Sequence, residues 1–184
     1  PKTVAIDCVY KNGHKATLKH LKSIEPSEDL LHTVVIPEVL KEDIQIKRRD
    51  KNHVIEVESD SLLTKHVEEE VPGYVYFEPE APYNKAVVVE RHGKNGNIAT
   101  AILKGFNLMQ GAIGSTIAHD SHNMILVGDN DDDILLAAKT LEHFHGGYVL
   151  VQNHEVKHII PCPIAGLIST QKAQVVSGLL KELK

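Results

Sequence analysis

The run Ala86-Val87-Val88-Val89, which lies between charged residues, constrains the fold more than any other feature of this chain. A continuous apolar run of this length, rich in β-branched residues, is typical of a strand buried on both faces. Segments that alternate between apolar and polar residues precede and follow it. We therefore expect residues 85–90 to form a buried strand in a larger sheet.

Turn signals and helical periodicity define the elements around this strand. Asn12-Gly13 predicts a tight turn within a β-hairpin over residues 3–21, and a second hairpin is expected over residues 148–160. Apolar stripes predict helices over residues 131–145 and 171–183, the first starting at the acidic run 129–133. The sequence thus predicts an α+β fold, with a mixed β-sheet and hairpins packed against a few helices.

Three other stretches are less regular. Ile44 and Ile46 alternate, residues 50–52 form a turn, and Val54 to Val57 return, which predicts another hairpin. Residues 60–83 carry three prolines and read as irregular. The pattern of residues 98–108 favours a helix.

Composition excludes several classes of protein. The 184 residues leave room for one domain, or one domain with a short appendage, and the first residue is Pro1 rather than Met, so we expect a piece of something longer. A formal net charge of −5 and only 4% aromatic residues argue against nucleic-acid binding. No apolar run approaches the roughly 18 residues of a membrane helix. With two cysteines and no visible signal peptide, the cytoplasm is the expected compartment.

The most specific polar segment is residues 119–123, His-Asp-Ser-His-Asn, which stands between two strand-like segments. Five consecutive polar residues are costly to bury without partners, so a loop that faces a cleft suits them. In the functional interpretation, His119, Asp120 and His122 are catalytic, as acid/base histidines and an orienting carboxylate, and Ser121 and Asn123 bind substrate through hydrogen bonds. The alternative is a polar turn with self-satisfied side chains. An extended backbone would direct His119 and Ser121 away from Asp120 and His122.

A second charged group ends the buried strand. Glu90, Arg91 and His92 come directly before the glycine turn of residues 93–97. Charged side chains at a strand end can line a cleft, and in that interpretation these three bind substrate. Equally, these three side chains can simply face solvent where the strand ends.

Metal-binding patterns are weak in this chain, although it has 12 histidines. His143-Phe144-His145 has the form of a metal motif, but it lies at the end of a predicted helix, where residues two apart point in different directions. The acidic run 129–133 lacks the glycine that a calcium loop needs. We therefore assign no metal ligand to this chain.

Several segments together resemble a known family. They are KAVVVERHGKNG, KGFNLMQGAIGSTIAHDSHNMILVGDNDDD, GGYVLVQ and PCPIAGLIS, with weaker similarity in EDIQIKRRD and SLLTKHV. These motifs resemble the C-terminal domain of bacterial and archaeal adenine deaminase over residues 34–184, which leaves residues 1–33 as a hairpin and linker. The hairpin then resembles the end of a small β-sandwich beside the catalytic barrel of such enzymes.

The resemblance implies an activity and its partners. The family belongs to the amidohydrolase superfamily, which implies hydrolysis of adenine to hypoxanthine and ammonia in purine salvage by a metal-activated water. The metal, commonly Mn²⁺ or Fe²⁺, is held by a barrel of roughly 250 residues, none of which is recognisable in this sequence. The implied partners are therefore adenine, that barrel and further copies of the protein, with no cofactor expected in this chain by itself.

Three interpretations remain open. In the first, this domain lends the loop 119–123 to the substrate pocket of the deaminase. In the second, it is a non-catalytic assembly or cover domain of that enzyme. In the third, the chain is a stand-alone histidine-rich metal-binding protein.

Overall fold

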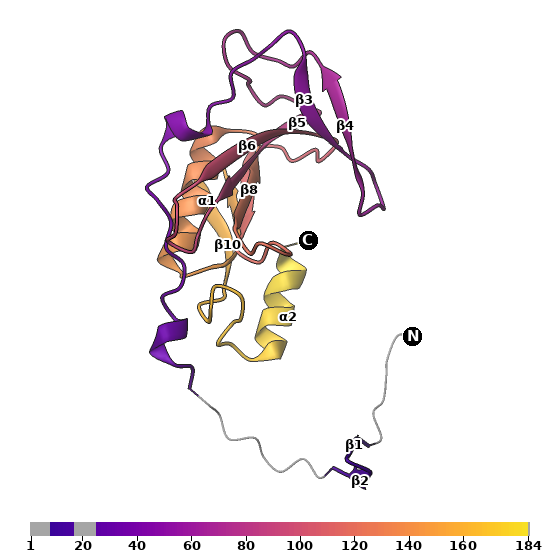
Figure 1. Ribbon diagram of the computed structural model, residues 1–184, viewed down its shortest axis with the longest axis vertical. Helices are drawn as coiled ribbons and strands as arrows, with labels where there is room; N and C mark the ends of the chain where they lie inside the picture. The colour runs from indigo at the N-terminus through magenta and orange to yellow at the C-terminus, as the bar shows by residue number, and fades with distance from the viewer. Residues whose placement is uncertain (1–7, 17–24, 184) are drawn as a thin grey trace.

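The computed structural model describes residues 8–16 and 25–183 (Figure 1). Its elements confirm the predicted α+β fold with a mixed sheet. In the described residues, no helix combines the length and hydropathy needed to cross a bilayer. In chain order the elements are β1 (Tyr10–Lys11), β2 (His14–Lys15), the 3₁₀ helices η1 (Glu28–Leu30) and η2 (Lys41–Ile44), β3 (Asn52–Val57), β4 (Thr64–Glu69), β5 (Tyr83–Val89), β6 (Ile98–Lys104), β7 (Gly111–Ser115), β8 (Met124–Gly128), α1 (Asp131–His143), β9 (Gly147–Gln152), β10 (Glu155–Pro161) and α2 (Ala173–Glu182).

The main sheet has eight strands in the order β10-β9-β7-β8-β5-β6-β3-β4. Neighbouring strands run antiparallel except β3 and β6, which run parallel. The predicted buried strand is β5, which pairs with β8 on one side and β6 on the other. Val87 and Val89 of β5 are fully buried. The aliphatic run therefore forms an inner strand, as its pattern predicts.

Helix α1 covers one face of the sheet. Asn130 caps its start, because the Asn130 side chain accepts a hydrogen bond of 2.8 Å from the backbone N–H of Asp133. The apolar stripe of the helix, including Ile134 and Leu141, is buried against β7, β8 and β9. This helix confirms the prediction from the acidic run and the apolar periodicity, and it holds the main core between helix and sheet.

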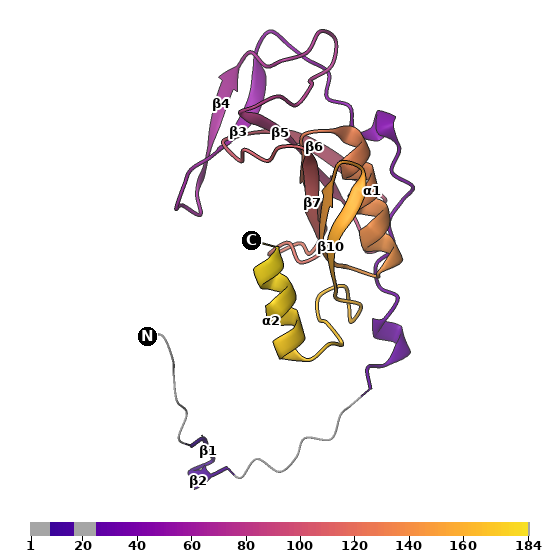
Figure 2. The ribbon, with the colours of Figure 1, turned by 180° about the vertical axis from the view of Figure 1, so that it is seen from behind.

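The opposite face of the sheet is only partly covered. Ala86, Leu103 and Val127 form a small buried cluster there. Beyond them lie apolar side chains that are half-buried or exposed. We call this set the open face: Val88, Ala99, Ile113, Ile125 and Leu150. In Figures 1 and 2, the β3–β4 hairpin and α2 project on the side of the sheet away from α1.

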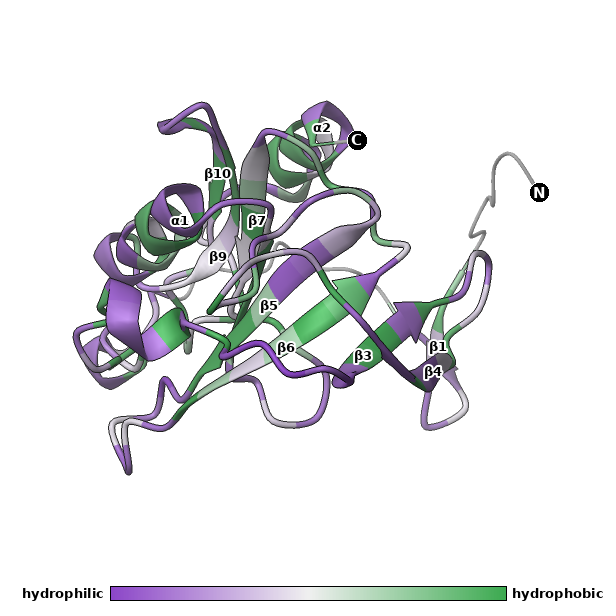
Figure 3. Ribbon diagram, turned by 90° about the horizontal axis from the view of Figure 1, so that it is seen from above, coloured by the Kyte–Doolittle hydropathy of each residue, from purple (hydrophilic) through white to green (hydrophobic). Residues whose placement is uncertain are grey.

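Helix α2 differs from its prediction. Figure 3 places α1 and α2 on opposite sides of β7, β9 and β10. The sequence pattern predicts an apolar stripe on the buried side of this helix, but no residue of α2 is buried, and Val175 and Leu180 are 48% and 41% exposed. Lys172 precedes the first turn of α2 and provides no side-chain cap. The apolar stripe is therefore present, but it has little to pack against among the described residues.

The N-terminal hairpin is confirmed within the described residues. Tyr10 pairs with Lys15 and Lys11 with His14, and both turn residues, Asn12 and Gly13, have positive φ. These two strands form a separate sheet with exposed side chains. Residues 3–7 and 17–21 of the predicted hairpin lie outside the described residues. A division of the chain into residues 1–33 and 34–184 stays a prediction.

Three predictions for residues 44–104 are wrong. Residues 98–104 form strand β6 rather than a helix, because β5 and β3 both pair with this segment along the backbone. Residues 60–83 are not irregular throughout, since they contain β4. Strand β3 pairs with β4 and β6, and not with residues 44–46 as predicted. In each case pairing with another strand overrides the local pattern.

Candidate functional site

The loop of residues 119–123 connects β7 to β8 at one end of the sheet. Its backbone turns sharply, with positive φ at Asp120 (72°) and His122 (51°). The N–H of His122 donates to the carbonyl of Ala118 at 2.9 Å, which closes the turn. The loop is therefore not extended, and its side chains do not alternate as they would along a strand.

The turn brings His119 and Asp120 together. Their side chains are in contact, and Nδ1 of His119 lies 2.9 Å from Oδ1 of Asp120. Both side chains project into solvent, with exposed fractions of 96% and 89%. A carboxylate beside an imidazole nitrogen orients the ring. The pair has the composition of an acid/base group, but it stands on a projection and not in a cleft of this chain.

The buried side chain of Arg91 supports the loop 119–123 through a hydrogen bond to its backbone. Its side chain is 1% exposed. The Nε atom of Arg91 donates to the carbonyl oxygen of His122, and a terminal nitrogen donates to the carbonyl of Ala165 at 3.2 Å. Burial lowers the pKa of the guanidinium, and no carboxylate pairs with it in residues 8–16 or 25–183. Arg91 thus ties the polar loop to the segment before α2.

His92 makes a second link from the strand end to the loop. Its Nε2 atom lies 3.1 Å from the carbonyl oxygen of Ser121, so this ring nitrogen is the donor. The remaining loop residues, His122 and Asn123, are half-buried. Nδ1 of His122 is buried and has no hydrogen-bond partner within the described residues. Nδ1 of His122 is therefore left available for a further hydrogen bond.

Glu90 has a different role from its two neighbours. Its carboxylate accepts hydrogen bonds from four backbone N–H groups of the turn that follows β5, those of residues 92, 94, 95 and 96. Burial on its own would raise the pKa of this carboxyl group, but the four N–H groups outweigh it and lower the pKa to about 2. The carboxylate of Glu90 is therefore occupied by the turn.

These contacts decide how the predicted site residues are arranged. The structure brings the loop and the strand end together through two side-chain contacts, Arg91 to His122 and His92 to Ser121. It does not gather the eight side chains around one cavity. Nothing in the geometry assigns a catalytic or substrate-binding role to any of them, so those roles stay predictions.

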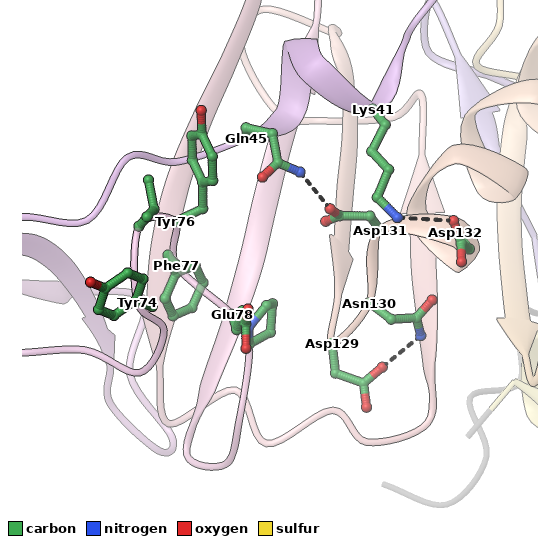
Figure 4. A pocket seen from close by; sticks show the side chains of 12 residues that line it. Lys41, Gln45, Tyr74, Tyr76, Phe77, Glu78, Asp129, Asn130, Asp131 and Asp132 are labelled. Atoms are coloured by element: carbon green, nitrogen blue, oxygen red, sulfur yellow. Dashed lines mark hydrogen bonds and ion pairs between the residues drawn. The ribbon is translucent and has the colours of Figure 1, made fainter.

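Sequence reasoning missed a hollow beside the start of α1. Figure 4 shows this hollow of about 580 Å³, lined by aromatic side chains on one side and by Asp129 to Asp132 on the other. The acidic run was visible in the sequence, but its partners were not. Asp131 accepts from Lys85 and Gln45, and Asp132 pairs with Lys41 at 3.5 Å. The carboxylates of Asp131 and Asp132 therefore already have partners, and we assign no ligand to the hollow.

Comparison with known proteins identifies the family. Residues 61–184 match the family described as the adenine deaminase C-terminal domain. This chain belongs to that family. The adenine deaminase of Desulfitobacterium hafniense (strain Y51) is 40% identical over 98% of this chain, and that of Halalkalibacterium halodurans is 38% identical over 96%. The adenine deaminase of Methanococcoides burtonii is 36% identical over 97% of the chain. The match spans only about a third of the length of each relative.

The loop of this adenine deaminase C-terminal domain does not fit the metal centre that the resemblance implies. His119 and Asp120 offer two ligand atoms on the outside of the loop, whereas the free nitrogen of His122 is buried. Among the described residues, three metal-ligand side chains converge at one place, on β3 and β4: His53, His66 and Glu68. No step of a deaminase reaction can therefore be derived through a metal held by the loop.

Proposed function

We propose that this chain is the C-terminal part of an adenine deaminase, which hydrolyses adenine to hypoxanthine and ammonia. Family membership and relatives named adenine deaminase over nearly the whole chain support the proposal. Because the chain spans about a third of those relatives, the reaction is assigned to the longer protein. The Mn²⁺ or Fe²⁺ centre and the amidohydrolase barrel belong, in this proposal, to the remaining two thirds.

The contribution of this domain is the loop 119–123. The single observation that carries this assignment is the exposed His119–Asp120 pair on a loop held by buried Arg91. A side chain that is lent to a neighbouring active site must project outward and must still be held in position. Imidazole gives and takes protons near neutral pH, so His119 can move a proton to or from the reacting purine while Asp120 orients the ring. Ser121 and Asn123 then supply hydrogen bonds to the base.

The surface around the loop supports docking of the barrel. Ile117, just before the loop, lines an apolar hollow together with Leu167 and the α2 residues Val176 and Leu180. Beside that hollow lies the open face of the sheet. Apolar side chains on an open sheet face and on an unburied helix favour contact with another protein surface. We assign this surface to the barrel of the same protein, which would bring the loop to its substrate pocket.

A second candidate function has a specific observation in its favour. The unburied stripe of α2 and the open face are also what an assembly or cover domain needs. In that case the loop is structural, and the His119–Asp120 pair makes no contact with adenine. Loop variants separate the two candidates, because a structural loop changes stability and oligomeric state while leaving the chemistry intact.

The experiment compares two proteins. Hypoxanthine and ammonia production from adenine is measured, with added Mn²⁺, for the 184-residue chain and for the same domain with its natural upstream sequence attached. The proposal predicts turnover by the longer protein and none by the shorter. Turnover by the shorter chain would contradict it, and so would a longer protein that folds, binds metal and does not deaminate adenine. We place the enzyme in the cytoplasm and in purine salvage, as its substrate suggests.

A further inference from the structure

Three metal-ligand side chains meet on the β3–β4 hairpin, away from the loop 119–123. His53 lies on β3, and His66 and Glu68 lie on β4. His53 stands directly opposite Glu68 in the antiparallel register, and His66 is opposite Ile55. Residues 66 and 68 therefore share the face of the hairpin on which residue 53 lies.

The ligand atoms are close enough for one ion. Nδ1 of His53 lies 2.8 Å from Nε2 of His66 and 3.7 Å from a carboxylate oxygen of Glu68. All three atoms lie within 4.8 Å of one another. Two ligands that are each about 2.1 Å from a tetrahedral zinc ion lie about 3.4 Å apart. The observed separations bracket that value, so small rotations of the side chains would suit a shared ion.

The backbone that carries these side chains is well supported, whereas the side chains themselves can adjust. On the other face of the hairpin, Val54 is fully buried and Val67 packs against the same cluster. The six residue pairs of β3 and β4 run without a register shift. The side chains of His53 and Glu68 are 65% and 49% exposed, so they can turn and solvent can supply further ligands. The hairpin thus presents the three groups on a fixed frame.

The donor set selects the kind of metal. Two imidazoles and one carboxylate suit a transition metal, whereas Mg²⁺ and Ca²⁺ prefer oxygen ligands alone. In the usual order of affinities, Zn²⁺ binds nitrogen and oxygen sites more tightly than Mn²⁺ or Fe²⁺ does. With three protein ligands, a tetrahedral zinc ion keeps its fourth position for water.

We propose that His53, His66 and Glu68 form a binding site for a zinc ion on the β3–β4 hairpin. The site is separate from the deaminase reaction, and the inference does not depend on the proposed function. It lies toward the side of the sheet that carries Leu103 and the open face, because Ile55 is paired with both His66 and Leu103.

The test is a titration of the 184-residue chain with zinc chloride by isothermal titration calorimetry, near neutral pH and without chelating buffer. The expected result is one zinc ion per chain. His53→Ala and His66→Ala each weaken binding, by at least about 10- to 100-fold, since even partners that only orient a ligand have effects of that size. Glu68→Gln weakens it less, because an amide oxygen can still coordinate. Cobalt(II) replaces zinc as a spectroscopic probe, and its tetrahedral absorption is expected in the unaltered chain and is lost in His53→Ala and His66→Ala.

The matched control is His143→Ala, which removes an exposed histidine at the end of α1 and is expected to leave zinc binding unchanged. Circular dichroism checks that each variant keeps its sheet. The proposal would be overturned if the folded chain bound no zinc, or if His53→Ala and His66→Ala bound zinc as tightly as the unaltered chain does. Loss of binding in His119→Ala or His122→Ala, with His66→Ala unaffected, would instead place the metal at the polar loop.

Discussion

The buried guanidinium of Arg91 donates a hydrogen bond to the carbonyl oxygen of His122, so the end of the central strand β5 holds the loop between β7 and β8. A second hydrogen bond from the same side chain reaches Ala165, between β10 and α2. Three segments far apart in the sequence are thus joined by one side chain. This arrangement explains how an exposed loop of polar residues keeps a defined shape.

Replacing Arg91 by Ala is expected to lower the free energy of unfolding by about 2–4 kcal/mol, because it leaves two carbonyl groups without a donor and removes a buried side chain. Urea denaturation of the 184-residue chain measures this change. Lys94→Ala, which alters an exposed side chain of the next turn, serves as the control and is expected to stay within about 0.5 kcal/mol. Equal stability of the two variants would show that Arg91 does not hold the loop.

The carboxylate of Glu90 makes the stability of the turn after β5 dependent on pH. Its pKa is lowered from 4.5 to about 2 in the folded chain. A lowered folded-state pKa means that the carboxylate stabilises the fold above pH 4.5, and that this contribution is lost as the pH falls from 4.5 toward 2. Glu90→Gln is expected to be less stable at neutral pH, with a shallower loss of stability in that acid range. Urea unfolding over a pH series compares the two, and parallel curves would contradict the assignment.

Lys85 and Asp131 form an ion pair of 2.5 Å between β5 and the first turn of α1, and the Lys85 side chain is 1% exposed. Asp131→Ala is expected to lower the free energy of unfolding by about 3–5 kcal/mol, because it leaves a buried ammonium group uncompensated. Adding Lys85→Met to that variant should recover part of the loss. The neighbouring substitution Asp132→Ala removes an exposed partner of Lys41 and should cost about 1 kcal/mol or less. Thermal or urea unfolding distinguishes these outcomes; similar losses for Asp131→Ala and Asp132→Ala would refute the buried pair.

The parts of the fold that sequence predicts well have strong local signals. The aliphatic run of β5, the capped apolar stripe of α1 and the Asn12-Gly13 turn are each encoded within about ten residues, and all three are confirmed. Residues 98–104 have no such signal, and their state is decided by β3 and β5 on either side. The apolar stripe of residues 173–182 correctly predicts that α2 is a helix. It does not predict whether the surface that covers the stripe belongs to the same chain.

The candidate site shows the same division. The sequence shows the polar residues 119–123 and the charged strand end 90–92. It does not show that the two segments lie close together in the fold. The β7–β8 and β5–β8 pairing brings them together. The His53–His66–Glu68 cluster could not be predicted, because it depends on the register of β4, a strand hidden within a segment that reads as irregular. Side chains that meet across strands need the register before they can be seen.

The central claim is that the loop 119–123 takes part in adenine deamination. It is tested most directly by steady-state kinetics of His119→Ala and His122→Ala in the longer protein that contains the upstream sequence, with Lys94→Ala as control. An acid/base role predicts that kcat/KM falls by about 10²- to 10⁴-fold in at least one histidine variant, while metal content and unfolding temperature stay near those of the unaltered protein. Unchanged kcat and KM in both variants would contradict the claim and leave the domain with an assembly or cover role.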